Sequence, residues 1–330
     1  MTDETERVLQ AHGLVKHFAA RGRSSTGRRH VVHAIDGVDL DIERGTTHAL
    51  VGESGCGKST VARLLLRLEA PTAGSIELLG RDLLKAGGAE LRSLRRSIQI
   101  VFQDPYASLN PRMTVGAIVG EPLRVYRLGS ITERRDRTVD LLRSVGLSET
   151  DASAYPHELS GGQRQRVAIA RAIALDPAVV VCDEPVSSLD VSIQAQVLAL
   201  LRELQETLGL AYLFISHDLA VVNQVAQRVS VMYLGKIVEN GTRNEVLRDS
   251  AHPYTRALLS AHPTRTNKDT SNPATARGEP PSATEPPSGC RFRTRCWKAT
   301  TVCATEEPPL RLISESHAVA CHFPEIPTDH

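Results

Sequence analysis

A glycine-rich segment, Gly52–Thr60 (GESGCGKST), constrains the fold more than any other part of the sequence. It follows an apolar run at residues 48–51 and leads into a segment with helical character at residues 59–68. Glycines let successive backbone N–H groups curve around phosphate oxygens, and the N-terminus of a following helix adds positive potential. The pattern is typical of an α/β core that binds the phosphates of a nucleotide at the ends of its strands.

Two side chains of this loop are expected to act on the phosphates directly. Lys58 is predicted to bridge the β- and γ-phosphates of ATP, and the hydroxyl of Ser59 is predicted to bind Mg²⁺. Cys56 is assigned no chemistry, because its role in the loop is to be small. The predicted nucleotide-binding residues of the loop are Gly52, Ser54, Gly55, Cys56, Gly57, Lys58, Ser59 and Thr60.

An acidic pair, Asp183 and Glu184, follows a second apolar run. Asp183 is predicted to hold Mg²⁺ and Glu184 to polarise the attacking water, since both would lie at the carboxyl end of a core strand. Gln103 is expected to complete the shell of Mg²⁺ and water, and His217 to contact the γ-phosphate. The predicted catalytic residues are Glu184, His217 and Lys58, and the predicted Mg²⁺ ligands are Ser59, Gln103 and Asp183.

The rest of the chain up to about residue 260 alternates between strand and helix patterns. Residues 6–50 contain short runs with β-type alternation, which predicts a small, mainly antiparallel β subdomain. Residues from about 104 to 160 change to amphipathic helical stretches, which predicts an inserted helical subdomain. Continuous apolar runs at 178–182 and 211–216 enclose a helical segment at 191–209. This order favours a parallel sheet covered on both faces.

Residues 159–163 (LSGGQ) form the most specific motif of the chain. Ser160 is suited to cap a helix whose exposed N–H groups bind an anion, and the two glycines permit close approach. The motif resembles the signature of the ATPases of ABC transporters, which other phosphate-loop families lack. The resemblance covers roughly residues 8–262 and predicts an ABC ATPase domain at 6–262.

The resemblance implies a P-loop NTPase (RecA-like) core with the N-terminal β subdomain, the helical insertion and a small cysteine-containing C-terminal extension. It also implies that two subunits bind Mg-ATP between them, the signature of one facing the γ-phosphate held by the other. Phe18 is then expected to stack on adenine, although an aromatic side chain there could equally belong to the core. The implied trans contacts are Ser160, Gly161, Gly162 and Gln163, and the implied D-loop is Ser188, Leu189 and Asp190.

More narrowly, residues 101–123, 187–201 and 252–259 resemble the oligopeptide and dipeptide importer ATPases, with the wording of the second ATPase of a heterodimeric pair. The resemblance implies ATP hydrolysis coupled to peptide uptake. The implied partners are a second ABC ATPase subunit, two transmembrane permease subunits and an extracytoplasmic solute-binding protein. Related importers of nickel, glutathione or another small solute have similar sequences in these segments and stay open as alternatives.

A soluble ABC ATPase of DNA repair or translation is a further alternative. Repair members carry long coiled coils between the two halves of the ATP site, and translation members usually carry two cassettes, and neither feature is present. A P-loop kinase is excluded by the signature motif. The formal net charge of +1 gives no reason to expect nucleic acid, and the basic cluster Arg21–Arg29 is interpreted as a solvated loop.

No uninterrupted apolar stretch approaches the roughly 20 residues needed to cross a bilayer, and the N-terminus lacks an export signal. We therefore expect a peripheral protein on the cytoplasmic face of the cell membrane. Residues 263–289 are rich in Pro, Thr, Ser and Ala and are predicted to be a linker.

The remaining segment, 290–330, is too short for a core of its own, so something other than apolar burial is expected to organise it. Four thiolates binding a metal would supply folding energy, and their spacing differs from the paired CxxC of zinc ribbons. The segment resembles the C-terminal extension of peptide-importer ATPases, in which the cysteines are associated with a [4Fe–4S] cluster; zinc, and free or oxidised thiols, stay open. His317 and His322 are interpreted as solvated rather than as substitute ligands. The predicted cluster ligands are Cys290, Cys296, Cys303 and Cys321.

Overall fold

The computed structural model describes residues 6–23, 29–261, 276 and 278–325. These residues divide into two compact units. The first contains the chain up to Leu9, Ile42–Thr46 and Leu78–Ile215, and the second contains Gln10–Asp41, Thr47–Glu77 and the chain from Ser216 onward. Most of the basic cluster and about half of the predicted linker lie outside the described residues, so both interpretations stay predictions.

Three parallel strands run through the first unit: β6 (Ile98–Val101), β7 (Val179–Asp183) and β8 (Ala211–Ser216). β7 pairs in parallel with both neighbours. All residues of β8 and the first four of β7 are buried. Strands buried on both faces read as continuous apolar runs, so the expectation of a covered parallel sheet is confirmed.

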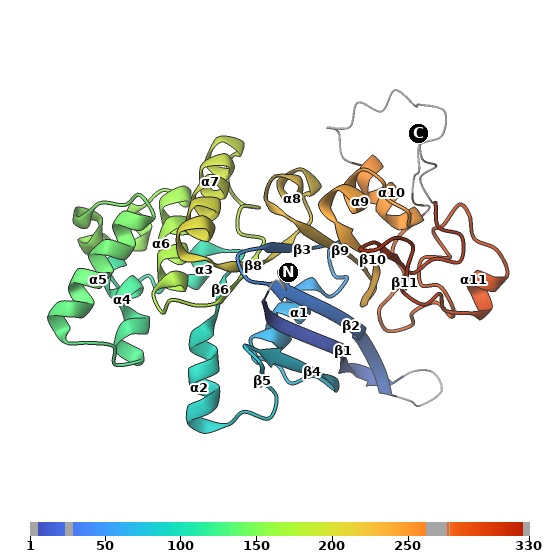
Figure 1. Cartoon of the computed structure of the whole chain (residues 1–330), viewed down its shortest axis with the longest axis horizontal. Helices are drawn as coiled ribbons and strands as arrows, with labels where there is room; N and C mark the ends of the chain where they lie inside the picture. Colours follow the sequence, from blue (N-terminus) through green and yellow to red (C-terminus); the bar gives the residue numbers. More distant parts are fainter. Residues whose placement is uncertain (1–5, 24–28, 262–275, 277, 326–330) are drawn as a thin grey trace, which may run out of the picture. The chain divides into compact units, whose positions relative to one another are not determined.

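Within the segment that the sequence marked as helical, about 104–160, the structure places α3, α4, α5, η1 and η2, whereas α2, α6 and α7 of this unit lie outside it. α4, α5 and α6 pack on one another (Figure 1). α5 begins at a reciprocal cap in which Ser130 and Glu133 each bond the backbone N–H of the other. The remaining elements of this unit are β5 (Arg81–Asp82), α2 (Gly88–Ser97), α3 (Pro105–Ser108), α4 (Val115–Val125), α5 (Ile131–Ser144), η1 (Glu149–Ser153), η2 (Pro156–Glu158), α6 (Gly161–Ile173) and α7 (Val191–Leu208).

The second unit contains the N-terminal β subdomain. Here β1 (Arg7–Arg23), whose first residues belong to the other unit, lies between β2 (Arg29–Glu43) and β4 (Ala73–Leu78) (Figure 1). Adjacent strands joined by so short a connection must run antiparallel. The expected antiparallel β subdomain is therefore confirmed.

A second set of strands in this unit joins the phosphate-loop strand to the C-terminal extension. β3 (Thr47–Val51) pairs in parallel with β9 (Arg228–Tyr233), and β9 pairs antiparallel with β10 (Lys236–Thr242). The extension then adds β12 (Ala318–Val319) to β10, and β11 (Arg311–Leu312) to β12. The helices of this unit are α1 (Lys58–Leu65), α8 (Leu219–Val225), α9 (Arg243–Leu247), α10 (Pro253–Ser260) and α11 (Val302–Thr305).

The extension also shares the hydrophobic core of the second unit. Phe292 is 1% exposed and belongs to the same cluster as Val51, Val231 and Tyr254. Apolar burial therefore contributes to organising the extension, which corrects the expectation that something else organises it. A short segment can bury a large aromatic ring when a larger neighbour supplies the other side of the core.

The helices of the described residues include none with the length and apolar character that a bilayer crossing requires.

Candidate nucleotide-binding site

The phosphate loop connects β3 to α1 in the second unit, and two of its glycines meet neighbouring backbone. Gly52 has φ +156°, and a Cβ there would lie 2.2 Å from the carbonyl oxygen of Met232. Gly57, the N-cap of α1, has φ +115°, and its Cβ would lie 2.5 Å from the carbonyl oxygen of Ala34. Any side chain would displace this backbone, so the loop requires glycine at both positions.

Lys58 is 6% exposed and lies over the interior of this loop. Its Nζ donates to the carbonyl oxygens of Gly52, at 2.7 Å, and Glu53, at 3.0 Å. Cys56 is 4% exposed and fills the space beside Gly52, and burial raises the pKa of its thiol. A buried ammonium that donates to two carbonyl oxygens can form a stronger, charge-assisted hydrogen bond with an anionic phosphate.

Two further predicted residues lie in the second unit. Phe18 is half-buried on β1, and Nζ of Lys16 lies 4.8 Å from the centre of its ring. His217 is exposed in the turn between β8 and α8. That turn is fixed because Asp218 caps α8, accepting from the N–H groups of Ala220 and Val221. The roles of Phe18 and His217 stay predictions.

In the first unit, the structure brings Gln103 and Glu184 together. Nε2 of Gln103 donates to Oε2 of Glu184 at 2.8 Å. Glu184 has φ +48°, and its backbone N–H donates to the carbonyl of Ile215 at 2.9 Å. A non-glycine residue in this region of φ is strained, and such strain concentrates at functional sites. Asp183, the last residue of β7, directly precedes it.

The signature motif forms the start of α6, as the sequence suggested. Ser160 is exposed, its hydroxyl accepts from the N–H of Gln163, and the Gln163 side chain accepts from the N–H of Ser160. The two glycines lie against Leu189, in the predicted D-loop, and against Ile193 on α7. A Cβ on Gly161 would lie 3.4 Å from Leu189, and a Cβ on Gly162 would lie 2.7 Å from Ile193.

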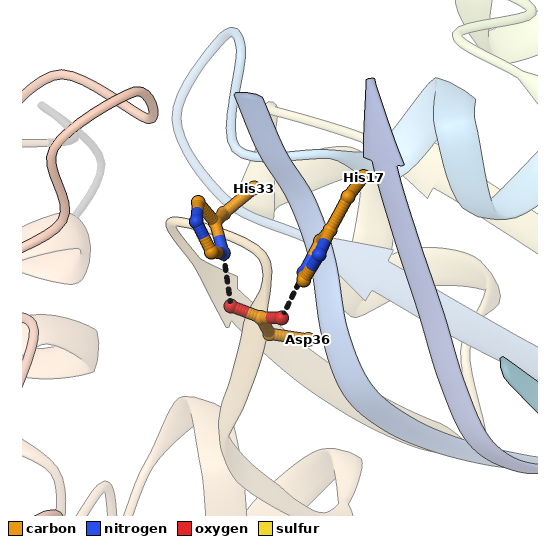
Figure 2. Close-up of side chains that lie close together, drawn as sticks. All are labelled: His17, His33 and Asp36. Atoms are coloured by element: carbon orange, nitrogen blue, oxygen red, sulfur yellow. Dashed lines mark hydrogen bonds and ion pairs between the residues drawn. The ribbon is translucent and has the colours of Figure 1, made fainter. Parts of the chain in front are cut away.

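A group that the sequence analysis missed lies on β1 and β2 (Figure 2). Nε2 of His17 and Oδ1 of Asp36 are 2.5 Å apart, and Nδ1 of His33 and Oδ2 of Asp36 are 3.3 Å apart. Among the described residues, this is the only set of three His, Cys, Asp or Glu side chains close enough to share one metal ion. Arg291 of the extension, however, donates to the same carboxylate.

Asp36 is therefore best explained as the centre of an ion-pair network. Burial alone would raise its pKa, but the hydrogen bonds and charges of His17 and Arg291 outweigh burial and lower the pKa to about 2. A guanidinium on the carboxylate opposes the approach of a cation. No local signal marks the network, because its members come from two strands and a distant loop.

The four cysteines of the extension line one small pocket, together with Phe292. They are half-buried or buried, and burial raises the pKa of Cys290 to about 11 and also raises that of Cys296 and Cys321. The interpretation of His317 as solvated is wrong: it is 3% exposed, and its Nε2 lies 2.8 Å from Oε1 of Glu239. The histidine ring is buried because β12, which follows it, pairs with β10.

Comparison with known proteins gives two family matches. Residues 35–187 match the model of the ABC transporter family, and residues 238–303 match that of the oligopeptide/dipeptide transporter C-terminal region. The second match includes Cys290, Cys296 and Cys303.

Several curated relatives align over most of the chain. The dipeptide transport ATP-binding protein DppF of Haemophilus influenzae is 48% identical over 97% of this chain and 99% of its own length. The oligopeptide transport ATP-binding protein AppF of Bacillus subtilis is 46% identical over 96% of this chain and 98% of its own. DppF of Escherichia coli is 49% identical over 92% of this chain and 91% of its own.

Solved structures agree with this assignment. The ATP-binding cassette MJ0796, in a dimeric post-hydrolysis state bound to ADP and Pi, is 30% identical with a TM-score of 0.63, over 71% of this chain and 98% of its own. The cassette cbiO1 of Clostridium perfringens, part of the ABC transporter complex cbiONQ, gives the same identity and TM-score over 73% of this chain and 90% of its own. The chain therefore belongs to the ABC transporter ATPases, within the group that carries the oligopeptide/dipeptide transporter C-terminal region.

Proposed function

We propose that this chain hydrolyses ATP to drive an importer of di- or oligopeptides. The observation that carries the proposal is similarity along nearly the whole length, C-terminal region included, to ATP-binding proteins named for dipeptide and oligopeptide transport. These names favour peptides over nickel, glutathione or another small solute. They also disfavour a soluble ABC ATPase of DNA repair or translation.

In the proposed reaction, Lys58 neutralises charge on the β- and γ-phosphates, and Glu184 orients the attacking water. The hydrogen bond from Gln103 supports this role, because it fixes the Glu184 carboxylate at the end of a core strand. Mg²⁺ would be held by Ser59, Gln103 and Asp183, and would screen the phosphate charge during transfer. His217 would contact the γ-phosphate.

A second ATPase subunit would complete each site. The exposed Ser160 and the helix N-terminus behind it support a contact with the γ-phosphate bound by the partner, since backbone N–H groups at a helix start attract anions. We infer that the partner is a related but different ATPase, on the sequence resemblance to one member of a heterodimeric pair.

Permease subunits would dock on the helical part of the first unit. α4, α5 and η1 line an open groove of about 930 Å³ there, with Met113, Ile131 and Val139 among its apolar residues. In the same unit, the guanidinium of Arg164 on α6 stacks 3.6 Å from the ring centre of Tyr106. This contact supports coupling of the segment after Gln103 to the signature helix. Such docking places the chain on the cytoplasmic face of the membrane, with a solute-binding protein on the other side.

The four thiols of the extension would hold a [4Fe–4S] cluster. One observation supports a shared site: all four cysteines line one pocket. The cluster would link distant parts of the extension through four thiolates. The thiols would release their protons when it binds.

Anaerobic purification followed by iron and acid-labile sulfide analysis tests this assignment. About four iron and four sulfide per chain are expected. Zinc without iron would refute the cluster.

The substitution Glu184→Gln tests the reaction. It should lower steady-state ATP hydrolysis by about 10²- to 10⁴-fold, because an amide cannot accept the proton of the attacking water. Binding of Mg-ATP should persist. Glu203→Gln, on the exposed face of α7, is the matched control and should hydrolyse ATP at the wild-type rate. Unchanged hydrolysis in Glu184→Gln would refute the assignment.

The substrate is tested by isolating the membrane complex with its solute-binding protein. Peptides released from that protein and identified by mass spectrometry are expected. A nickel ion or glutathione in their place would correct the substrate class.

A further inference from the structure

Glu53, the second residue of the phosphate loop, is held by the C-terminal region from two sides. Its carboxylate accepts two parallel hydrogen bonds from the guanidinium of Arg295, at 2.8 and 3.0 Å. Its backbone N–H donates to the hydroxyl of Tyr254 at 2.9 Å. Its carbonyl oxygen, at the same time, accepts from Nζ of Lys58 at 3.0 Å. A continuous chain of polar contacts therefore runs from the extension to the phosphate-binding lysine.

Arg295 is held firmly enough to fix its partner. It is 7% exposed and lies about 6 Å from the ring centres of Tyr233 and Phe292, at 5.9 and 6.0 Å. A buried guanidinium paired in two-point geometry leaves little freedom to the carboxylate it binds. Burying such a pair seldom adds net stability, which points to a role in positioning.

The loop that carries Arg295 is itself anchored on both sides. It lies between Cys290 and Cys296, and Phe292 packs 5.4 Å from Tyr254 and 5.3 Å from Tyr233 between ring centres. Arg291 donates to the carbonyl of Leu234 and to Asp36. The position of Arg295 therefore depends on the whole segment between two of the thiols.

We propose that Arg295 of the extension, together with Tyr254 on α10, is a positioning residue for nucleotide binding, so that the C-terminal region sets the shape and charge of the phosphate loop. Arg295 cancels the negative charge of Glu53, which would otherwise repel the triphosphate in the same loop. Tyr254 withdraws the N–H of Glu53 from the phosphate and fixes the loop backbone. The inference rests on the proposed function, because it concerns the same ATP site.

The test measures binding of Mg-ATP to the purified full-length chain by calorimetry. Arg295→Gln should weaken affinity by about tenfold, because an uncompensated carboxylate then lies in the loop. Arg293→Gln is the matched control, since the hydrogen bonds given for the Arg293 side chain in the described part of the chain go only to Ser288, and its backbone bond to Cys290 is kept in the variant. That control should bind like the wild type.

The double variant Arg295→Gln with Glu53→Gln separates positioning from folding. Removing the carboxylate as well should restore most of the lost affinity, whereas damage to the fold would persist or worsen. Arg295→Lys should restore part of it, because a single ammonium keeps the charge but loses the two-point geometry. Failure of the double variant to bind better than Arg295→Gln would overturn the charge argument.

Tyr254→Phe keeps the aromatic packing and removes only the hydroxyl, so it tests the second contact even if Arg295→Gln does not fold. Affinity should fall by about threefold. If Tyr254→Phe and folded Arg295→Gln both bind Mg-ATP with wild-type affinity, the inference is overturned and the proposed function stays intact. A wild-type chain that binds no Mg-ATP would instead refute the proposed function itself.

Discussion

The phosphate loop and the signature motif are both glycine-containing turns that open a helix, but they are held in different ways. In the phosphate loop, Gly52 and Gly57 press against carbonyl groups of distant segments, and Lys58 is buried. In the signature, the exposed Ser160 is fixed by a cap with Gln163 three residues away. The first turn is a cradle shaped by long-range contacts. The second is a local structure that leaves its N–H groups open to a partner.

The largest loss of stability is expected at Gly52, because the phosphate loop has no space for a side chain there. Gly52→Ala should lower the free energy of unfolding by about 3 kcal/mol, because its Cβ would overlap the carbonyl of Met232 at 2.2 Å. Gly55→Ala is the control, with φ +77° but no atom within 4 Å of the added Cβ, and should cost about 1 kcal/mol. Urea unfolding of the purified chain measures both. Equal losses would show that the surrounding backbone does not shape the loop.

A smaller effect is expected at Asp36, which ties the β subdomain to the extension. Because its pKa is lowered to about 2, its carboxylate stabilises the fold fully above the unfolded pKa of about 3.9. That contribution is lost as the pH falls from about 4 to about 2. Asp36→Asn should therefore lower the free energy of unfolding by about 2 kcal/mol at pH 7, and the difference from wild type should shrink below pH 4.

Urea unfolding at several pH values from 7 to 3 measures this difference. Asp140→Asn, at an exposed position on α5, should match the wild type throughout. A loss in Asp36→Asn that stays constant down to pH 3 would contradict an ionic origin.

The smallest effect is expected at the signature, whose cap is local and exposed. Ser160→Ala should cost about 1 kcal/mol, since it removes one capping hydrogen bond. Thr207→Ala, within α7, removes a hydroxyl that bonds the carbonyl of Glu203 and should be close to neutral. If Ser160→Ala and Thr207→Ala lower the free energy of unfolding by the same amount, the Ser160 cap does not stabilise the start of α6.

Sequence reasoning succeeded where a motif is also a local structure. The strand before the phosphate loop, the helix after it and the capped start of α6 follow from short-range hydrogen bonding and periodicity. The same reasoning failed for His317, because its burial depends on β12 joining a strand about 80 residues earlier. It also left out Glu53, because the phosphate-loop motif accepts any residue type at that position.

The sequence by itself determined the ATPase family, the phosphate loop and the signature, because each requires particular residue types at fixed short spacing. Only the tertiary structure decided that Arg295 reaches Glu53 across 242 residues and that Arg291 joins His17 and His33 on Asp36. The physical reason is that pairing between distant charges depends on the path of the whole chain. No local pattern encodes that path.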